Sequence, residues 1–260
     1  MKAAQARVLL TGATGGIGQA VASSLISAGA SLMLAGRSAS TLAMQARTLQ
    51  DSAGESRVTW HAADLANPAQ ITTLAGVAAD WNCNVVIHNA GVANFGRFAN
   101  GSAEETASVL GINLVAPMLL TQSMLPHLLS QPAAQVMCVG SVLGRLGLPG
   151  YSVYSASKFG LRGFAEALRR ELLGTSVAVQ YLGPRSTRTG FNSPEALAYN
   201  QATGTQSDAP DVVADALLKL LESRAAERFL GFPEKFAVCL NGLAPALLDS
   251  AFDKHRASLA

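Results

Sequence analysis

Short apolar runs alternate with longer amphipathic segments along most of this chain. The apolar runs are rich in Val, Leu and Ile, which is typical of strands buried on both faces of a sheet. We expect strands at 7–10, 31–35, 57–62, 84–88, 135–139 and 176–182, with a short last strand at 228–232. Between them the pattern predicts helices at 19–28, 39–53, 68–79, 104–130, 154–173 and 211–224.

This alternation predicts an α/β fold, a doubly wound parallel sheet of the Rossmann type with helices on both faces. No Pro/Gly/Ser-rich linker divides the chain, so we expect one domain over 1–260, with a core at about 7–232. Residues 185–207 are rich in Ser, Thr, Asn and Gly and predict a long loop. Residues 233–260 predict an extra apolar helical tail, broken by Pro245.

The composition narrows the class of protein. Of 260 residues, 49% are hydrophobic and 14% charged, and the net charge is +2 without a Lys/Arg run, so no nucleic acid is expected as partner. We find no apolar run near the ~20 residues that span a bilayer and no signal-peptide core, which predicts a cytoplasmic protein. Three widely spaced cysteines fit reduced thiols, and the four histidines lack metal-ligand spacing, so no metal is expected.

Glycines cluster in the turn between the first strand and the first helix, at Gly12, Gly16 and Gly18. There the backbone can approach a pyrophosphate, and the helix N-terminus offers N–H groups and the positive end of its dipole. The spacing is Gly-x-x-x-Gly-x-Gly, and packing alone is the other explanation for such a turn. Its place between a strand and a helix favours dinucleotide binding.

The end of the second strand bears on the choice of cofactor. NAD sites usually place an acidic residue about 20 residues after the glycines, on the ribose 2′-hydroxyl. Here Arg37 stands at that place, and no Asp or Glu occurs between Gly18 and Asp51. Because an arginine pairs with a 2′-phosphate, we expect NADP(H) to be preferred over NAD(H); a surface arginine is the alternative.

Tyr154 and Lys158 are one helical turn apart on the predicted helix. An unperturbed tyrosine hydroxyl has a pKa near ~10, too high for easy proton exchange at neutral pH. A nearby ammonium favours the phenolate, so the pair predicts a proton donor whose pKa is lowered by a cation. Alone, two unrelated helix residues would explain the same spacing.

Taken together, the motifs over about 7–191 resemble those of the short-chain dehydrogenase/reductase family. In chain order they are the turn from Thr11 to Gly18, the pair Asp64-Leu65, the strand end His88-Asn89-Ala90-Gly91 with histidine in place of the family's first asparagine, Asn113, Ser141, and the Tyr154/Lys158 pair.

The resemblance implies roles for these residues. Ser141 would hold the substrate oxygen and Tyr154 would protonate it as hydride arrives. Lys158 would lower the tyrosine pKa and bind the nicotinamide ribose, and Asn113 would position a water that returns the proton. The cofactor-binding residues implied are Gly12, Thr14, Gly16, Ile17, Gly18, Arg37, Asp64, Leu65, Asn89, Ala90, Gly91, Tyr154, Lys158, Pro184 and Thr189.

Two departures from the family pattern matter. Many NADPH-dependent members carry a basic residue where this chain has Gly15, which leaves Arg37, with help from Ser38, to select NADP. The family's Pro-Gly after the sixth long strand is here Pro184-Arg185. Arg185 would alter the turn, reach toward substrate or face solvent.

The function implied is an NADPH-dependent carbonyl reductase acting on a hydrophobic ketone or 3-oxoacyl-type substrate. The cleft loops at 92–100 and 143–150 are largely apolar, and their Arg97 and Arg145 could meet an anionic substrate group or remain at the surface. The alternatives are an alcohol dehydrogenase running toward oxidation and a non-catalytic NADP-binding regulator, which the four catalytic residues disfavour.

The family also implies a homodimer or homotetramer through the helices at 104–130 and 154–173. For the tail, three readings stay open: packing on the substrate cleft, a dimer contact, or peripheral membrane contact.

Overall fold

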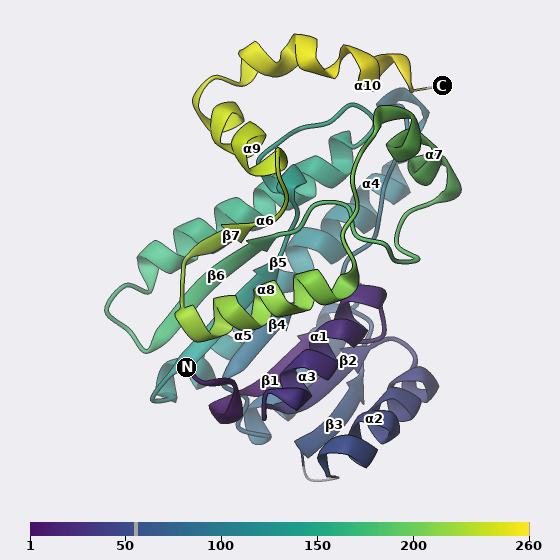
Figure 1. The fold of residues 1–260 in the computed structure, drawn as a ribbon. Coiled ribbons are helices and arrows are strands. Elements are labelled where there is room, and N and C mark those ends of the chain that lie inside the picture. Colours follow the sequence, from purple (N-terminus) through teal and green to yellow (C-terminus); the bar gives the residue numbers. More distant parts are fainter. Residues whose placement is uncertain (55–56, 260) are drawn as a thin grey trace.

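The computed structural model describes residues 1–54 and 57–259, in which seven parallel strands form one sheet in the order β3-β2-β1-β4-β5-β6-β7 (Figure 1). The strands are β1 Arg7–Thr11, β2 Ser31–Gly36, β3 Val58–Ala62, β4 Val85–His88, β5 Ala134–Val139, β6 Val177–Gly183 and β7 Glu227–Phe229. The strand order reverses between β1 and β4, which places a switch point at their carboxyl ends. The doubly wound sheet predicted from the sequence is confirmed.

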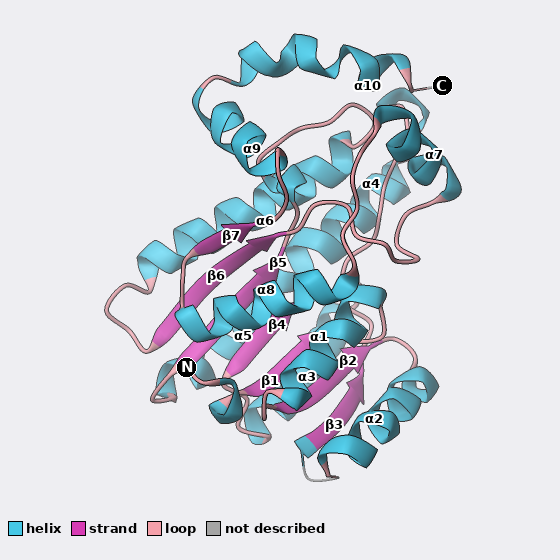
Figure 2. Ribbon diagram, in the orientation of Figure 1, coloured by secondary structure: helices cyan, strands magenta, loops and turns pink. Residues whose placement is uncertain are grey.

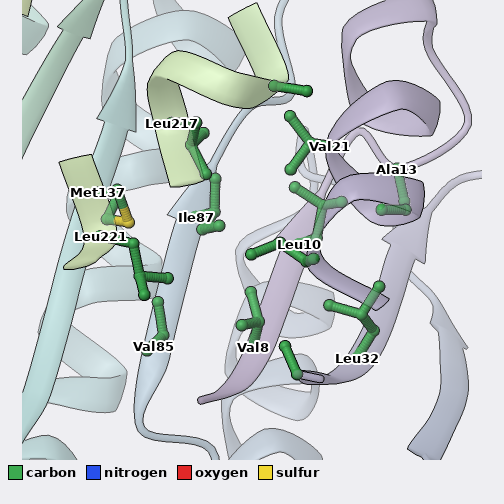
Figure 3. Packing of buried hydrophobic residues seen from close by; sticks show 14 of the residues in the cluster. Val8, Leu10, Ala13, Val21, Leu32, Val85, Ile87, Met137, Leu217 and Leu221 are labelled. Carbon is green, nitrogen blue, oxygen red and sulfur yellow. The ribbon is translucent and has the colours of Figure 1, made fainter. Parts of the chain in front are cut away.

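Helices cover both faces of the sheet. One face carries α1 Gly16–Ser27, α2 Ala39–Ala53 and α8 Pro210–Ser223, and the other carries α3 Pro68–Asp80, α5 Ala116–Ser130 and α6 Ser152–Glu171. Side chains of strand β1 pack against the helices on both faces of the sheet. Val8 and Leu10 lie beneath α1 and α8 (Figure 3), whereas Leu9 packs on the face covered by α3, α5 and α6. Each such fully buried side chain stabilises the fold by ~1.5–3 kcal/mol.

The helix predicted at 104–130 is present but not uniform. It begins as α4 Ala103–Leu110, passes through a π-helical turn at Gly111–Val115 and continues as α5. By length and composition alone this 28-residue helix could cross a membrane, contrary to our expectation that no such apolar stretch exists. Its Leu120, Met124 and Leu128 are buried against the sheet, as in the core helix of a globular domain.

The predicted loop at 185–207 contains a helix, α7 Pro194–Thr203, so that prediction was wrong. Ser193 caps the helix by accepting a hydrogen bond from the Ala196 amide, and Pro194 occupies its first turn. Gly204 ends it in the left-handed conformation, with φ at 73°. These local signals outweigh the polar composition that suggested a loop.

The chain beyond the sheet is the C-terminal tail, residues 233–259, which forms α9 Glu234–Leu243, a 3-10 segment Pro245–Phe252 and α10 Asp253–Ala257. The helical tail and its break at Pro245 were predicted, but the last strand ends at Phe229 instead of reaching Phe232, whose side chain is 79% exposed. Figure 2 shows the tail beyond the arrowheads of the strands, on the same side as α4 and α7.

Candidate active site

The glycine-rich turn is held tightly against the end of β4. Gly12 has φ at +62°, and a Cβ there would lie 2.7 Å from the Cα of Ala90, so only glycine fits. The Thr11 hydroxyl accepts hydrogen bonds from the amides of Asn89 (3.0 Å) and Ala90 (3.1 Å). The Asn89 side-chain amide donates back to the carbonyls of Thr11 and Gly12. The two strand ends at the switch point are therefore tied together.

Helix α1 leaves its first turn available for an anion. Its N-cap, Gly15, has no side chain to accept from the first amides, and the helix carries no acidic residue in its first turn. Uncapped N–H groups at a helix start suit the pyrophosphate of a dinucleotide. The donor set at this turn therefore fits the nicotinamide cofactor implied by the sequence.

One cavity of about 1020 Å³ joins this turn to the candidate catalytic residues. Every predicted cofactor-binding residue lines it: Gly12, Thr14, Gly16, Ile17, Gly18, Arg37, Asp64, Leu65, Asn89, Ala90, Gly91, Tyr154, Lys158, Pro184 and Thr189. Ser141 lines the same cavity, so a hydride donor bound along the turn would share its space with the serine, tyrosine and lysine.

The loop after β6 closes over the turn from the opposite side. A Cβ at Gly16 would lie 2.5 Å from Cγ2 of Thr189, so the loop and the turn touch. Arg185 is held by ion pairs to Asp208 (2.7 Å) and Glu234 (3.4 Å), and its side chain is 15% exposed. It therefore neither faces solvent nor carries an uncompensated charge toward a substrate; it links this loop to the start of α9.

Asn113 lies behind the cavity in the π-helical turn and is fully buried. Its side chain accepts from the Val92 amide (2.8 Å) and donates to the Val92 carbonyl (3.0 Å) and the Ser157 hydroxyl (3.2 Å). Ser157 in turn donates to the Tyr154 carbonyl at 2.7 Å. Ser157 was not predicted as a site residue, although it directly precedes Lys158 in the sequence.

Tyr154 and Lys158 both lie on α6, as their spacing predicted, and Nζ of Lys158 lies 5.6 Å from the centroid of the tyrosine ring. Burial raises the pKa of the Tyr154 hydroxyl above its ordinary value, while the hydrogen bond to the Ser141 side chain acts in the opposite direction. The expectation that Lys158 lowers this pKa is not met in this structure. The lysine itself is buried, which lowers its own pKa to about 8, and it donates to the Val139 carbonyl at 3.3 Å.

Ser141 caps the short 3-10 helix Val142–Gly144, and its hydroxyl oxygen accepts from the Leu143 amide at 3.1 Å. The backbone N–H and C=O of Ser141 both bond to the hydroxyl of Tyr181, at 3.0 and 2.9 Å. Tyr181 lies on β6, 2% exposed. Tyr181 was not predicted as a site residue, since nothing in a strand pattern indicates which main chain a tyrosine hydroxyl will reach.

The other end of the cavity is apolar and is closed by the tail. The buried residues there are Val142, Leu143, Leu146, Tyr151, Tyr199 and Val238, with Phe95, Leu148, Phe252 and Leu259 packed on them. Tyr199 of α7 bonds to His255 of α10, and Arg97 donates to the Leu259 carbonyl. Arg145 pairs with Glu227 at 3.3 Å, so neither predicted loop arginine serves an anionic substrate group in this structure. Of the three readings of the tail, the structure shows the one in which it packs on the cleft.

His88 replaces the family's asparagine at the end of β4 and is 3% exposed. Its Nε2 lies 2.8 Å from the Thr121 hydroxyl, and burial lowers its pKa to about 4, so the ring is neutral at neutral pH. Within residues 1–54 and 57–259, no three His, Cys, Asp or Glu side chains gather as a metal site.

This chain is similar in sequence to a known protein family and to characterised members of it. Residues 6–199 match the family model described as short chain dehydrogenase. The chain is 32% identical over 223 residues to the ketoacyl reductase HetN of Nostoc sp. (strain PCC 7120), covering 85% of this chain and 76% of that protein. It is 29% identical over 257 residues to dehydrogenase/reductase SDR family member 7B of Mus musculus, covering 92% and 78%.

Solved structures agree with the fold. A short-chain dehydrogenase/reductase from Burkholderia phymatum in complex with NAD superposes with a TM-score of 0.85 at 25% identity, covering 95% of this chain and 96% of that one. A short-chain dehydrogenase from Sphingobium yanoikuyae in complex with NADPH gives 0.77 at 26%, covering 94% and 95%. Both cofactors thus occur among the similar structures.

Proposed function

This chain belongs to the short-chain dehydrogenase/reductase family, an oxidoreductase family acting on CH–OH and C=O groups, and we propose that it is an NADPH-dependent reductase of a hydrophobic ketone or 3-oxoacyl-type substrate. The observation that carries the proposal is the shared cavity, which brings Ser141, Tyr154 and Lys158 together with the glycine-rich turn. Oxidation of an alcohol would use the same residues in reverse; the proposed cofactor preference favours reduction.

The chemistry follows from where the side chains lie. When bound, the reduced nicotinamide supplies a hydride to the carbonyl carbon. The Ser141 hydroxyl donates a hydrogen bond to the carbonyl oxygen and holds it beside Tyr154, whose hydroxyl gives that oxygen its proton. Lys158, whose Nζ lies 5.6 Å from the centroid of the Tyr154 ring, would bind the nicotinamide ribose beside it. Asn113, which is fixed to Val92 and Ser157, would position the water through which a proton returns to Lys158.

The preference for NADP rests on Arg37, which is exposed at the cavity just after β2. A guanidinium at this place pairs with a 2′-phosphate, and no carboxylate follows Gly18 before Asp51 to repel that phosphate. We expect the Kd for NADPH to be at least about tenfold lower than that for NADH, the size of one charge-assisted contact. Arg37→Glu removes this difference, whereas Arg47→Glu, on the exposed side of α2, leaves it unchanged.

The substrate class rests on the apolar end of the cavity. Leu143, Leu146 and Leu148 come from the loop after β5, and Ala237 and Phe252 come from the tail. Apolar walls beside a single serine–tyrosine pair favour a substrate that is apolar apart from its carbonyl group. A screen of NADPH oxidation with ketones and 3-oxoacyl thioesters of rising chain length tests this: rates rise to an optimum length, and equal rates at every length contradict the proposal.

Assembly and location are part of the same proposal. Val115 (44% exposed) and Phe159 (42% exposed) lie outward on the helix at 103–130 and on α6, which supports pairing through these helices as a homodimer or homotetramer. Unpaired Cys83, Cys138 and Cys239 suit a reducing compartment, the cytoplasm. Light scattering and cell fractionation test these two points.

The outer side of α9 carries exposed apolar side chains that support a contact of the tail with a membrane. Phe236 is 67% and Leu243 81% exposed, one near each end of the helix, and Phe232 precedes them. We propose peripheral membrane contact through this surface in addition to packing on the cleft. Co-sedimentation with phospholipid vesicles that Phe236→Ser abolishes supports it, and absence of co-sedimentation by the unchanged protein contradicts it.

A further inference from the structure

Tyr181 makes contacts with the catalytic serine that its position in β6 does not require. Its hydroxyl accepts a hydrogen bond from the Ser141 amide at 3.0 Å and donates one to the Ser141 carbonyl at 2.9 Å. In the ladder register Tyr181 is paired with Cys138, so its side chain extends forward beyond the end of β5 to reach Ser141. One hydroxyl therefore bonds to both polar groups of this residue's main chain, and the carbonyl also accepts from the Gly144 amide at 3.0 Å.

The amides on either side of Ser141 bond to the neighbouring backbone, whereas the Ser141 amide itself bonds to Tyr181. The amide of Gly140 donates to the Leu182 carbonyl, and that of Val142 donates to the Pro184 carbonyl, each at 2.8 Å. Between them the Ser141 amide has the tyrosine hydroxyl as its partner. A buried amide without a partner is costly, so the hydroxyl determines where this segment of main chain lies.

Two glycines keep space for the tyrosine ring. A Cβ at Gly140 or at Gly144 would lie 2.0 Å from the Tyr181 hydroxyl oxygen, which no side chain tolerates. Phe229 packs on the other side of the ring, with centroids 5.8 Å apart. Burial raises the pKa of Tyr181 above its ordinary value, so the hydroxyl keeps its proton and remains a donor over the working pH range.

We propose that Tyr181 is a positioning residue for the reaction, whose hydroxyl fixes the Ser141 main chain so that the serine side chain and Tyr154 meet the same substrate oxygen. This rests on the proposed function. Tyr181 contacts no reacting atom; it acts through Ser141. A displacement of about 1 Å at such a group can reduce the rate by about a hundredfold.

Tyr181→Phe tests the proposal because it keeps the ring and removes only the hydroxyl. We expect kcat to fall by about tenfold or more, with KM and the Kd for NADPH changed by less than about twofold. The double variant with Ser141→Ala should be no slower than Ser141→Ala alone, since no serine hydroxyl is left to position. A merely structural role predicts that the two losses multiply.

Gln180→Leu is the matched control. Gln180 is the neighbouring residue on β6 and, because strand side chains alternate, its side chain points to the other face of the sheet. There it donates to the carbonyls of Leu220 and Ala225, so its loss also removes two buried hydrogen bonds. We expect this variant to unfold at a lower temperature but to keep its kcat.

A second measurement needs neither substrate nor cofactor. Hydrogen exchange of the Ser141 amide, followed by NMR in the cofactor-free protein, should accelerate in Tyr181→Phe and stay unchanged in Gln180→Leu. Failure of the unchanged protein to oxidise NADPH with any ketone refutes the proposed function, whereas the exchange result still decides the contact. An unchanged exchange rate, an unchanged kcat, or multiplying losses in the double variant each overturn the inference.

Discussion

The hydroxyl of Tyr199 lies 2.8 Å from Nδ1 of His255, and this pair joins α7 to the C-terminal tail at the apolar end of the cavity. The same hydroxyl donates to the Pro149 carbonyl at 3.0 Å, so its single hydrogen is committed there. Nδ1 of His255 must therefore donate to the tyrosine oxygen, which assigns the imidazole tautomer. Three segments far apart in the sequence thus meet at one hydroxyl.

His255→Ala should loosen the tail over the substrate end of the cavity. It removes the bond to Tyr199 and the ring contacts with Tyr199 and Phe252, both at 5.5 Å. We expect KM for a hydrophobic ketone to rise several-fold, about 1 kcal/mol of lost binding, with the Kd for NADPH unchanged. Steady-state kinetics and cofactor titration measure this. Arg256→Ala, whose side chain is 77% exposed, is the control, and equal effects of the two variants would contradict the prediction.

Tyr154→Phe should abolish turnover, with kcat lowered by about a thousandfold, because the substrate oxygen loses its proton donor. NADPH should still bind, since the glycine-rich turn and Arg37 are untouched. Single-turnover kinetics and a fluorescence titration of NADPH separate the two effects. A variant that keeps near-full kcat shows that another group supplies the proton.

Lys158→Met should stabilise the cofactor-free protein while it removes activity. The lysine pKa is lowered to about 8 from 10.5 by burial, so the unfolded chain binds this proton more tightly than the folded one. Below pH 8 the buried ammonium lowers the free energy of unfolding by its full amount, on the order of 3 kcal/mol, and this cost shrinks as the pH rises toward 10.5. Thermal unfolding should show a higher Tm for the variant at pH 7 and a smaller gain at pH 9.5.

The control for this variant is Lys219→Met on the exposed side of α8, which should give no gain at either pH. A Lys158→Met variant with an unchanged Tm at pH 7 would mean that the buried ammonium is well compensated by its surroundings.

His88→Asn should make the fold more resistant to acid. The folded protein holds this ring neutral down to its pKa of about 4, whereas the unfolded chain protonates it near 6.5. The wild type therefore loses stability as the pH falls from about 6.5 to 4, and asparagine does not titrate there. Urea unfolding at pH 7 and pH 4.5 should show a smaller loss for the variant, whereas His61→Asn, partly exposed on β3, should resemble the wild type. Parallel losses in all three proteins would refute the prediction.

The local signals in the sequence were sufficient for most of the framework. Buried strands such as β4 are apolar up to their last residue, and the turn from Gly12 to Gly18 combines a strand end with a helix start. The candidate catalytic residues were predicted from motifs that resemble the family's, and Ser141, Tyr154 and Lys158 line one cavity with the turn. The helix at 194–203 also had local signals, Ser193-Pro194 and Gly204, and was missed because composition was weighed above them.

By itself, then, the sequence determined most of the order of strands and helices, because periodicity and turn chemistry act between near neighbours. Through its resemblance to the family's motifs it also predicted the nucleotide turn and the candidate catalytic residues. Only the tertiary structure decided that Tyr181 holds Ser141, that Arg185 pairs with Asp208 and Glu234, and that the tail closes the cleft through His255. It also decided that burial raises the Tyr154 pKa against the expected effect of Lys158. These are contacts and desolvation between segments distant in the chain, and they exist only once the sheet and its helices have packed.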